Sequence, residues 1–244
     1  MFPVMLRVGP VELYSYGLML ALAFLAGVAV ATAESKRRGL HPEELTDLFL
    51  VTAVMAVLSA RLLHVALSWD LYAGSPWQVL SVWEGGLSIH GGVAGGLVTG
   101  WWFARRRHLP YLVLADATAP GLILGTAIGR LGCFLNGCCY GVVTAGWWGT
   151  RTRYAPGWRH PTQLYELVLA LGLFAFLWSR RRLPVRSGRL FFMYVAGYAG
   201  IRLVVEAFRE VDGYLGRLTY AQAVSLLLLA VAGAFLVRTR KTHP

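Results

Sequence analysis

The chain has 244 residues, of which 57% are hydrophobic and only 14% are charged, and its mean hydropathy is +0.55. A soluble domain carries about 25% charged residues, so this composition excludes an ordinary water-soluble fold and indicates an integral membrane protein. The formal net charge is +11, but the positive residues stand in short clusters between apolar runs. That distribution argues against nucleic acid as a partner and is typical of the basic loops of membrane proteins.

Apolar segments recur along the chain at the length of about 20 residues that a helix needs to cross the hydrocarbon core. We predict an all-α, polytopic membrane protein in which residues 1–244 form a single domain of seven transmembrane helices. The predicted spans are residues 14–33, 46–67, 88–104, 112–133, 163–179, 190–208 and 219–237. The third span is rich in glycines at spacings of four, which favours close packing against another helix.

Lysine and arginine cluster after every odd-numbered span. Fourteen of the 23 lie on that side and six on the other, while Arg61, Arg130 and Arg202 lie within spans. By the positive-inside rule, we expect the N-terminus outside and the C-terminus in the cytoplasm. Two outer-face loop regions follow, residues 68–87 with Trp83 among their aromatic residues, and residues 134–162. Their aromatic residues are typical of the membrane interface belt; guiding a lipid or a peptide is the alternative.

The fourth span ends in the sequence Gly-Arg-Leu-Gly-Cys-Phe-Leu-Asn-Gly-Cys-Cys-Tyr-Gly, residues 129–141. A charged residue within a span is costly and usually functional, and the glycines allow a backbone to approach a ligand or another helix closely. A fork of guanidinium donors in this setting favours an anionic phosphate of a lipid head group. The three cysteines suit packing in a crowded turn or a disulfide. We expect no metal, because no second CxxC or His/Cys cluster completes a zinc site.

In the predicted topology, polar groups from six spans come to the same depth, in the outer half of the membrane. We interpret them as lining one cavity open to the outer leaflet. Two alternatives to a role in this cavity stay open. Arg202 and Glu206 are four residues apart and could simply neutralise each other, and Arg61 could be a structural cation. The candidate site residues are Tyr16, Arg61, His90, Arg130, Asn136, Gly141, Gln163, Arg202 and Glu206.

Five motifs, in order, resemble the prolipoprotein diacylglyceryl transferase family over nearly the whole chain. They are Tyr14-Ser15-Tyr16-Gly17-Leu18-Met19, Ser88-Ile89-His90-Gly91-Gly92, residues 129–141, His160-Pro161-Thr162-Gln163-Leu164-Tyr165-Glu166, and Arg202-Leu203-Val204-Val205-Glu206 followed by Phe208-Arg209. The third motif departs from the family pattern, because Cys133 and Cys138 stand where the better-known pattern has Asn and Glu. We therefore expect a branch of the family.

The resemblance implies an enzyme of the bacterial inner membrane that transfers diacylglycerol from phosphatidylglycerol to the lipobox cysteine of a preprolipoprotein and releases glycerol 1-phosphate. It implies a site facing the periplasmic leaflet, with membrane lipids and signal peptides as partners. The proposed chemistry needs no cofactor or metal, because the phospholipid is already an activated donor, and we expect a monomer. His90 is the candidate base, Arg130 and Arg202 stabilise phosphate charge, and Glu206 orients Arg202. Tyr16 and Asn136 donate hydrogen bonds. Gly141 permits close approach of the lipid, and Gln163 and Arg61 complete the substrate-binding set.

Three other functions compete. A paralogue of the same fold would transfer a lipid group to another acceptor, which the cysteine departures favour. A lipid or anion transporter would line both halves of the membrane with polar groups, whereas here the inner half is apolar. An intramembrane protease is disfavoured, because the sequence has no GxSxG, no HExxH and no pair of aspartates in spans.

Overall fold

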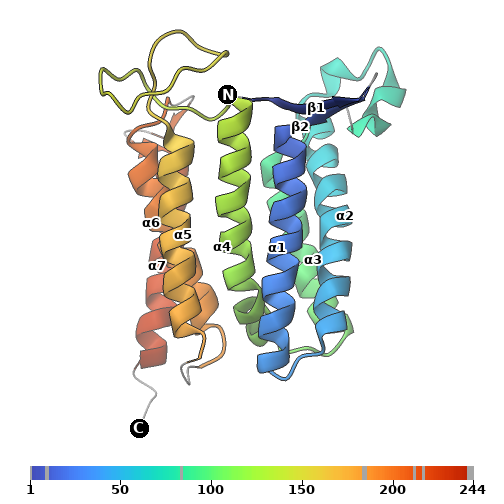
Figure 1. Cartoon of the computed structure of the whole chain (residues 1–244). Coiled ribbons are helices and arrows are strands. Elements are labelled where there is room, and N and C mark those ends of the chain that lie inside the picture. The colour runs from blue at the N-terminus through green and yellow to red at the C-terminus, as the bar shows by residue number, and fades with distance from the viewer. Residues whose placement is uncertain are drawn as a thin grey trace. The chain divides into compact units, whose positions relative to one another are not determined.

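The computed structural model describes residues 2–8, 11–82, 85–182, 186–210, 213–215 and 218–240. Within them seven long helices form the bulk of the structure, which confirms the predicted all-helical class (Figure 1). Trp83 lies outside the described residues, as do Arg217 and Lys241, which are among the basic residues counted on the two sides of the membrane. The seven helices are α1 Ser15–Arg37, α2 Pro42–Leu67, α3 Ile89–Arg106, α4 Tyr111–Asn136, α5 Thr162–Arg180, α6 Arg189–Glu206 and α7 Tyr220–Arg240.

Short elements that the sequence analysis did not predict stand between the helices. Two antiparallel hairpins pair β1 (Val4–Val8) with β2 (Val11–Tyr14), and β3 (Tyr214–Leu215) with β4 (Leu218–Thr219). Two turns of 3₁₀ helix, Trp69–Leu71 and Pro76–Leu80, lie within the first predicted loop region. Local pairing of this kind satisfies backbone groups where the chain leaves a helix.

Five helices, α1, α2, α4, α5 and α7, are long and apolar enough to cross a membrane. The other two are 18 residues each, and α6 carries three charged residues, Arg189, Arg202 and Glu206. Composition as well as length distinguishes α3 and α6 from the other five helices. The structure thus supports a membrane protein, and the number of spans and the orientation of the termini stay predictions.

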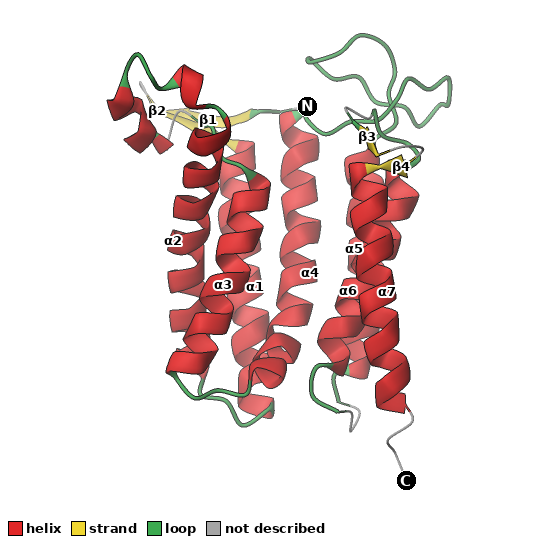
Figure 2. Cartoon of the chain, turned by 180° about the vertical axis from the view of Figure 1, so that it is seen from behind, coloured by secondary structure: helices red, strands yellow, loops and turns green. Residues whose placement is uncertain are grey.

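The chain divides into two compact units, and each is described by itself. The smaller unit, Ser35–Leu114, holds α2 and α3, which run side by side (Figure 2). Glycines of α3 face α2: a Cβ at Gly91 would lie 2.5 Å from the Ser59 carbonyl oxygen, and one at Gly95 would lie 2.2 Å from Ser59 Oγ. Only glycine fits at this distance, so the predicted packing role of these glycines is confirmed.

The larger unit, Met1–Glu34 with Ala115–Pro244, holds the other five helices. Here α1 and α4 touch backbone to backbone, since a Cβ at Gly121 would lie 2.5 Å from the Gly27 carbonyl oxygen. A buried apolar cluster joins α4, α5 and α6 through Ile123, Leu177 and Leu190. In lipid the drive between helices is close packing rather than water exclusion, which explains the small residues at these contacts.

Asp116, fully buried in α4, fixes the start of α6. Its carboxylate oxygens accept hydrogen bonds from the backbone N–H groups of Gly188 and Phe191, each at 2.8 Å. The first N–H groups of a helix have no partner within it, and a carboxylate supplies one. The sequence analysis placed no site role on Asp116, and this capping contact gives it a structural one.

Candidate functional site

The centre of the larger unit is an ion-pair cluster built on Glu166, in the first turns of α5. One carboxylate oxygen lies 2.9 Å from Nε of Arg130 on α4, and the other lies 3.2 Å from Nη1 of Arg202 on α6. The Glu166 side chain is 1% exposed, whereas the arginine side chains are 19% and 18% exposed. The buried carboxylate on α5 thus holds one guanidinium group from α4 and one from α6. Both arginine side chains are partly exposed.

Further contacts fix this cluster. Glu206 pairs with Nη2 of Arg202 at 2.9 Å and accepts a hydrogen bond from the Thr219 hydroxyl at 3.0 Å. Tyr198 donates its hydroxyl to Glu166 at 2.9 Å. The predicted contact between Glu206 and Arg202 is confirmed, and it is one part of a larger network rather than an isolated neutral pair.

The charges of the cluster balance, yet its guanidinium groups keep hydrogen-bond donors for a further group. Two carboxylates neutralise two guanidinium groups, which lowers the cost of placing them in an apolar protein. Arg130 meets Glu166 through Nε, and a guanidinium has further N–H donors on its two terminal nitrogens. These donors have the fork geometry that matches a phosphate.

A tight turn ends α4 six residues after Arg130. The N–H of Cys138 donates to the Cys133 carbonyl at 3.2 Å, the N–H of Gly137 donates to the Phe134 carbonyl at 3.1 Å, and Gly137 has a φ of +83°. This is the Schellman arrangement, in which glycine takes the left-handed position and the side chains on either side of the turn meet. Asn136 is the last residue of α4 and is half-buried. The turn therefore returns the chain towards the site instead of leading it away.

The same turn gathers Cys133, Cys138 and Cys139. All three are free thiols whose Sγ atoms lie within 4.8 Å of one another, with 3.8 Å between those of Cys138 and Cys139. Hydrogen bonds from the other two thiols and the positive charges of Arg130 and Arg209 hold the pKa of Cys139 below the ordinary range of a thiol, against the opposing effect of burial.

The start of α5 holds the cysteine turn in place. The Thr162 hydroxyl donates to the Cys139 carbonyl at 2.7 Å, and the Gln163 side-chain amide donates to the Cys138 carbonyl. Gln163 is 1% exposed, and its Oε1 has no hydrogen-bond partner among the described residues. Since Glu166 follows one turn later, a single helix end supports both the turn and the arginines.

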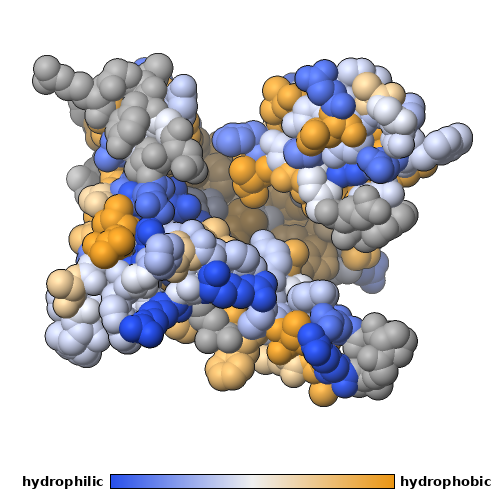
Figure 3. Space-filling view, turned by 90° about the horizontal axis from the view of Figure 1, so that it is seen from above, coloured by the Kyte–Doolittle hydropathy of each residue, from blue (hydrophilic) through white to orange (hydrophobic). Residues whose placement is uncertain are grey.

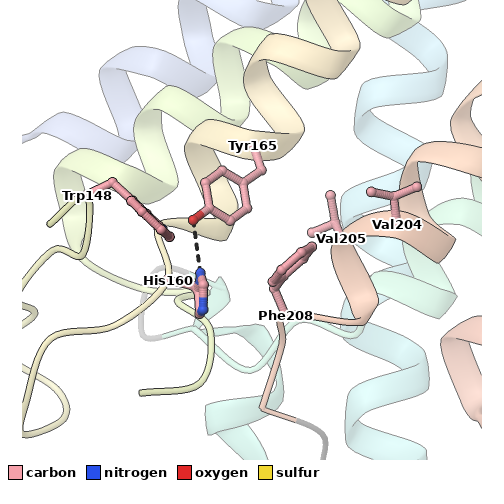
Figure 4. A pocket seen from close by; sticks show the side chains of 6 residues that line it. All are labelled: Trp148, His160, Tyr165, Val204, Val205 and Phe208. Carbon is pink, nitrogen blue, oxygen red and sulfur yellow. Dashed lines mark hydrogen bonds between the residues drawn. The ribbon is translucent and has the colours of Figure 1, made fainter. Parts of the chain in front are cut away.

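An apolar pocket lies beside this helix end. Its volume is about 470 Å³, and Figure 4 shows the six residues that line it, Trp148, His160, Tyr165, Val204, Val205 and Phe208. His160 Nδ1 and the Tyr165 hydroxyl are 2.9 Å apart, and the Phe208 ring contacts both rings, tilted against His160 and edge-on to Tyr165. Its mostly apolar lining suits an apolar chain, and His160 and Tyr165 form a polar pair at one wall.

Gly141 lies against protein backbone. A Cβ there would lie 2.1 Å from the Phe208 carbonyl oxygen, and the residue forms an antiparallel bridge with Arg209. The missing side chain therefore accommodates the backbone that follows α6. The predicted close approach of a lipid to Gly141 stays a prediction.

Arg61 also has a different environment from a phosphate ligand. It is 5% exposed in the smaller unit, and its guanidinium donates to the carbonyls of Val79 at 2.9 Å and Gly86 at 3.0 Å, and to those of Gln78 and Gly85. Its donors are engaged with the first loop region. These contacts support the structural role that the sequence analysis gave as an alternative, and a part for Arg61 in substrate binding stays a prediction.

Tyr16 and His90 lie on different units. Tyr16 is the second residue of α1 and is 43% exposed, and a Cβ at Gly132 would lie 3.5 Å from its ring. His90 lies in the first turn of α3 in the smaller unit, with an exposed side chain. Tyr16 is thus placed beside the end of α4, and the relation of His90 to Arg130 stays a prediction.

The exposed loops mix polar and aromatic surface. Trp147 is 92% exposed and Trp158 is 49% exposed within residues 134–162. In the view of Figure 3, hydrophilic and hydrophobic residues lie next to one another. Such amphipathic surface is typical of proteins that contact the membrane interface.

Sequence reasoning missed three members of the network, Glu166, Tyr198 and Thr219. Glu166 was noted in a motif but received no role, although a carboxylate at the start of an apolar span requires a cationic partner. Tyr198 lies four residues before Arg202, on the same face of α6, and that spacing was the available signal.

The chain is similar to known proteins over nearly its whole length. The family model described as prolipoprotein diacylglyceryl transferase matches residues 3–238. The chain is 35% identical over 245 residues to the phosphatidylglycerol–prolipoprotein diacylglyceryl transferase of Bacillus mycoides strain KBAB4, covering 96% of this chain and 91% of the relative. It is 36% identical over 248 residues to proteins of the same name from Bacillus cereus strain ATCC 14579 and Bacillus anthracis, covering 98% of this chain and 92% of each relative.

Proposed function

The chain belongs to the prolipoprotein diacylglyceryl transferase family, and we propose that it transfers the diacylglyceryl group of phosphatidylglycerol to the lipobox cysteine of preprolipoproteins. The acceptor thiolate attacks the glycerol carbon that carries the phosphate. A carbon–sulfur bond forms, the carbon–oxygen bond breaks, and its electron pair leaves with glycerol 1-phosphate. The thiol proton passes to a base, for which His90 is the proposed group.

The observation that carries this proposal is the bridge from Glu166 to Arg130 and Arg202. Negative charge grows on phosphate oxygen as the carbon–oxygen bond breaks. Donors that are fixed in place before the reaction stabilise that charge without reorganising. Since the two arginines come from different helices and share one buried carboxylate, their separation is set by the fold.

The remaining proposed roles follow from position. Glu206 orients Arg202, Glu166 and Gln163 fix the end of α4, and Tyr16 and Asn136 donate hydrogen bonds to phosphate or glycerol oxygens. The apolar pocket beside His160 supports a lipid substrate, because an acyl chain needs a surface of this kind.

We further propose seven spans in one transmembrane domain of the bacterial inner membrane, acting as a monomer, with the N-terminus and the site on the periplasmic side and the C-terminus in the cytoplasm. The distribution of basic residues supports this orientation. Phosphatidylglycerol would enter from the lipid, and the signal peptide would present its cysteine at the outer face.

The test uses purified protein in detergent with phosphatidylglycerol and a lipobox peptide, followed by mass spectrometry. We expect a diacylglyceryl adduct on the peptide cysteine and an equal amount of glycerol phosphate, both lost in Arg130→Ala. A peptide with serine in place of the lipobox cysteine is the matched substrate control. Folded protein that forms no adduct, beside an active relative, would contradict the proposal and favour the paralogue with another acceptor.

A further inference from the structure

The three thiols beside the arginine cluster have no task in the proposed transfer. They are all the cysteines of the chain, and they are free. Cys133 is buried and the other two are half-buried. The turn at Gly137 brings Cys133 and Cys138 together, and Cys139, with a φ of +62°, directs its side chain back to them. A non-glycine residue in this conformation is uncommon and is kept when the surrounding structure requires it.

Their spacing matches a metal bound by three sulfurs. A metal–thiolate bond is about 2.3 Å long, so three sulfurs in a plane around one metal are about 4.0 Å apart. The Sγ atoms of Cys138 and Cys139 are 3.8 Å apart, and all three lie within 4.8 Å of one another. Closing the group around an ion needs only side-chain adjustment, because the carbonyls of Cys138 and Cys139 are already fixed by Gln163 and Thr162.

The donor set selects a soft ion. Thiolates favour Cu(I) and zinc over hard cations, and a structural zinc site takes four protein ligands. Among the described residues, the group of ligand atoms within this distance holds only the three cysteines. The nearby carboxylate of Glu210 is paired with Arg159 at 2.8 Å. Three soft ligands without a fourth suit three-coordinate Cu(I) best.

We propose that Cys133, Cys138 and Cys139 bind one Cu(I) ion as three thiolates. Three sulfur–copper bonds form, three thiol protons pass to solvent, and nothing is oxidised or reduced. An adjacent cavity of about 380 Å³, lined partly by Cys138, Cys139 and Arg209, gives the ion a route to the sulfurs. The positive charge of Arg209 offsets part of the negative charge that three thiolates leave around a monovalent ion.

The site is independent of the transferase proposal, and its readout is the metal itself. Full-length protein in detergent, freshly reduced and kept free of oxygen, is titrated with Cu(I) in competition with bicinchoninate. We expect one Cu(I) per chain, an X-ray absorption spectrum dominated by sulfur neighbours, and a higher unfolding temperature with the ion bound. Zn(II), titrated in parallel, binds more weakly.

Variants separate this site from chance binding. Cys133→Ser, Cys138→Ser and Cys139→Ser should each weaken Cu(I) binding by about tenfold or more, and the triple serine variant should not bind. Cys133→Ala replaces the serine variant if the buried hydroxyl prevents folding. His108→Ala, at an exposed histidine of the smaller unit, is the matched control and should bind as the parent does.

Three results would overturn the proposal. They are no binding by the fully reduced protein, a Cys133 variant that binds as tightly as the parent, and Cu(I) retained by the triple serine variant. Mass spectrometry of alkylated protein taken directly from membranes provides a second check. A stable disulfide among the three cysteines there would assign the cluster to redox chemistry instead.

Discussion

Glu166 Oε1 lies 2.9 Å from Nε of Arg130, a buried carboxylate of α5 against a cation of α4. Through this pair the fold fixes the position of Arg130, the candidate phosphate-binding residue. The other oxygen of Glu166 holds Arg202, so one side chain determines where both guanidinium groups stand.

The first prediction concerns this carboxylate. Glu166→Gln keeps the shape but removes the charge that holds both arginines, and displacement of a catalytic group by about 1 Å costs on the order of 100-fold in rate. We expect a loss of transfer of that order, measured as kcat with a lipobox peptide. Glu34→Gln is the matched control, since Glu34 is also buried and paired with Arg181 at 2.9 Å. It should affect stability and leave activity per folded molecule unchanged, and equal losses in both variants would refute a specific role.

Arg130 and Arg202 are predicted to act through their fork geometry as well as their charge. Alanine at either position should lower kcat by about 100-fold or more, and lysine should restore only part of it, because an ammonium cannot bond bidentately. The measurement is kcat and KM for phosphatidylglycerol. Arg180→Lys, at the far end of α5, is the control. Full activity in Arg130→Lys and Arg202→Lys would show that charge alone is needed.

His90 is predicted to accept the thiol proton. A positioned general base contributes about 10²–10⁴-fold to the rate of a proton transfer. His90→Ala should lower kcat by a factor in this range, and its pH–rate profile should differ in shape from that of the parent enzyme. His108→Ala serves for comparison. A profile that keeps its shape in an active His90→Ala enzyme would exclude His90 as the base.

Gly141 is predicted to matter for stability through the space that it leaves to Phe208. Gly141→Ala forces a Cβ to within 2.1 Å of a carbonyl oxygen, and overpacking of this kind costs about 1–3 kcal/mol. We expect a lower unfolding temperature in detergent. Gly172→Ala, where a Cβ meets nothing within 4 Å, should be near neutral. A Gly141→Ala protein as stable as the parent would mean that the end of α6 can shift.

The sequence by itself determined the class of the protein, because spans of apolar residues and sparse charge allow few folds besides a helical membrane bundle. It determined the seven helices nearly to their ends, and it indicated Arg130, Arg202 and Glu206, since charge in an apolar segment stands out without any structure. Motif order indicated the family for the same reason, as each motif is local in the chain.

Only the tertiary structure decided which groups meet. It showed that the Arg61 guanidinium donates to the carbonyls of a loop, and that the space at Gly141 is occupied by the backbone of Phe208. It joined Arg130 and Arg202 through Glu166, and it closed three cysteines into one cluster. These facts depend on contacts between different helices, or on the direction in which a turn sends its side chains. Spacing along the chain carries neither, because a helix pattern specifies which residues share a face but not what packs against it.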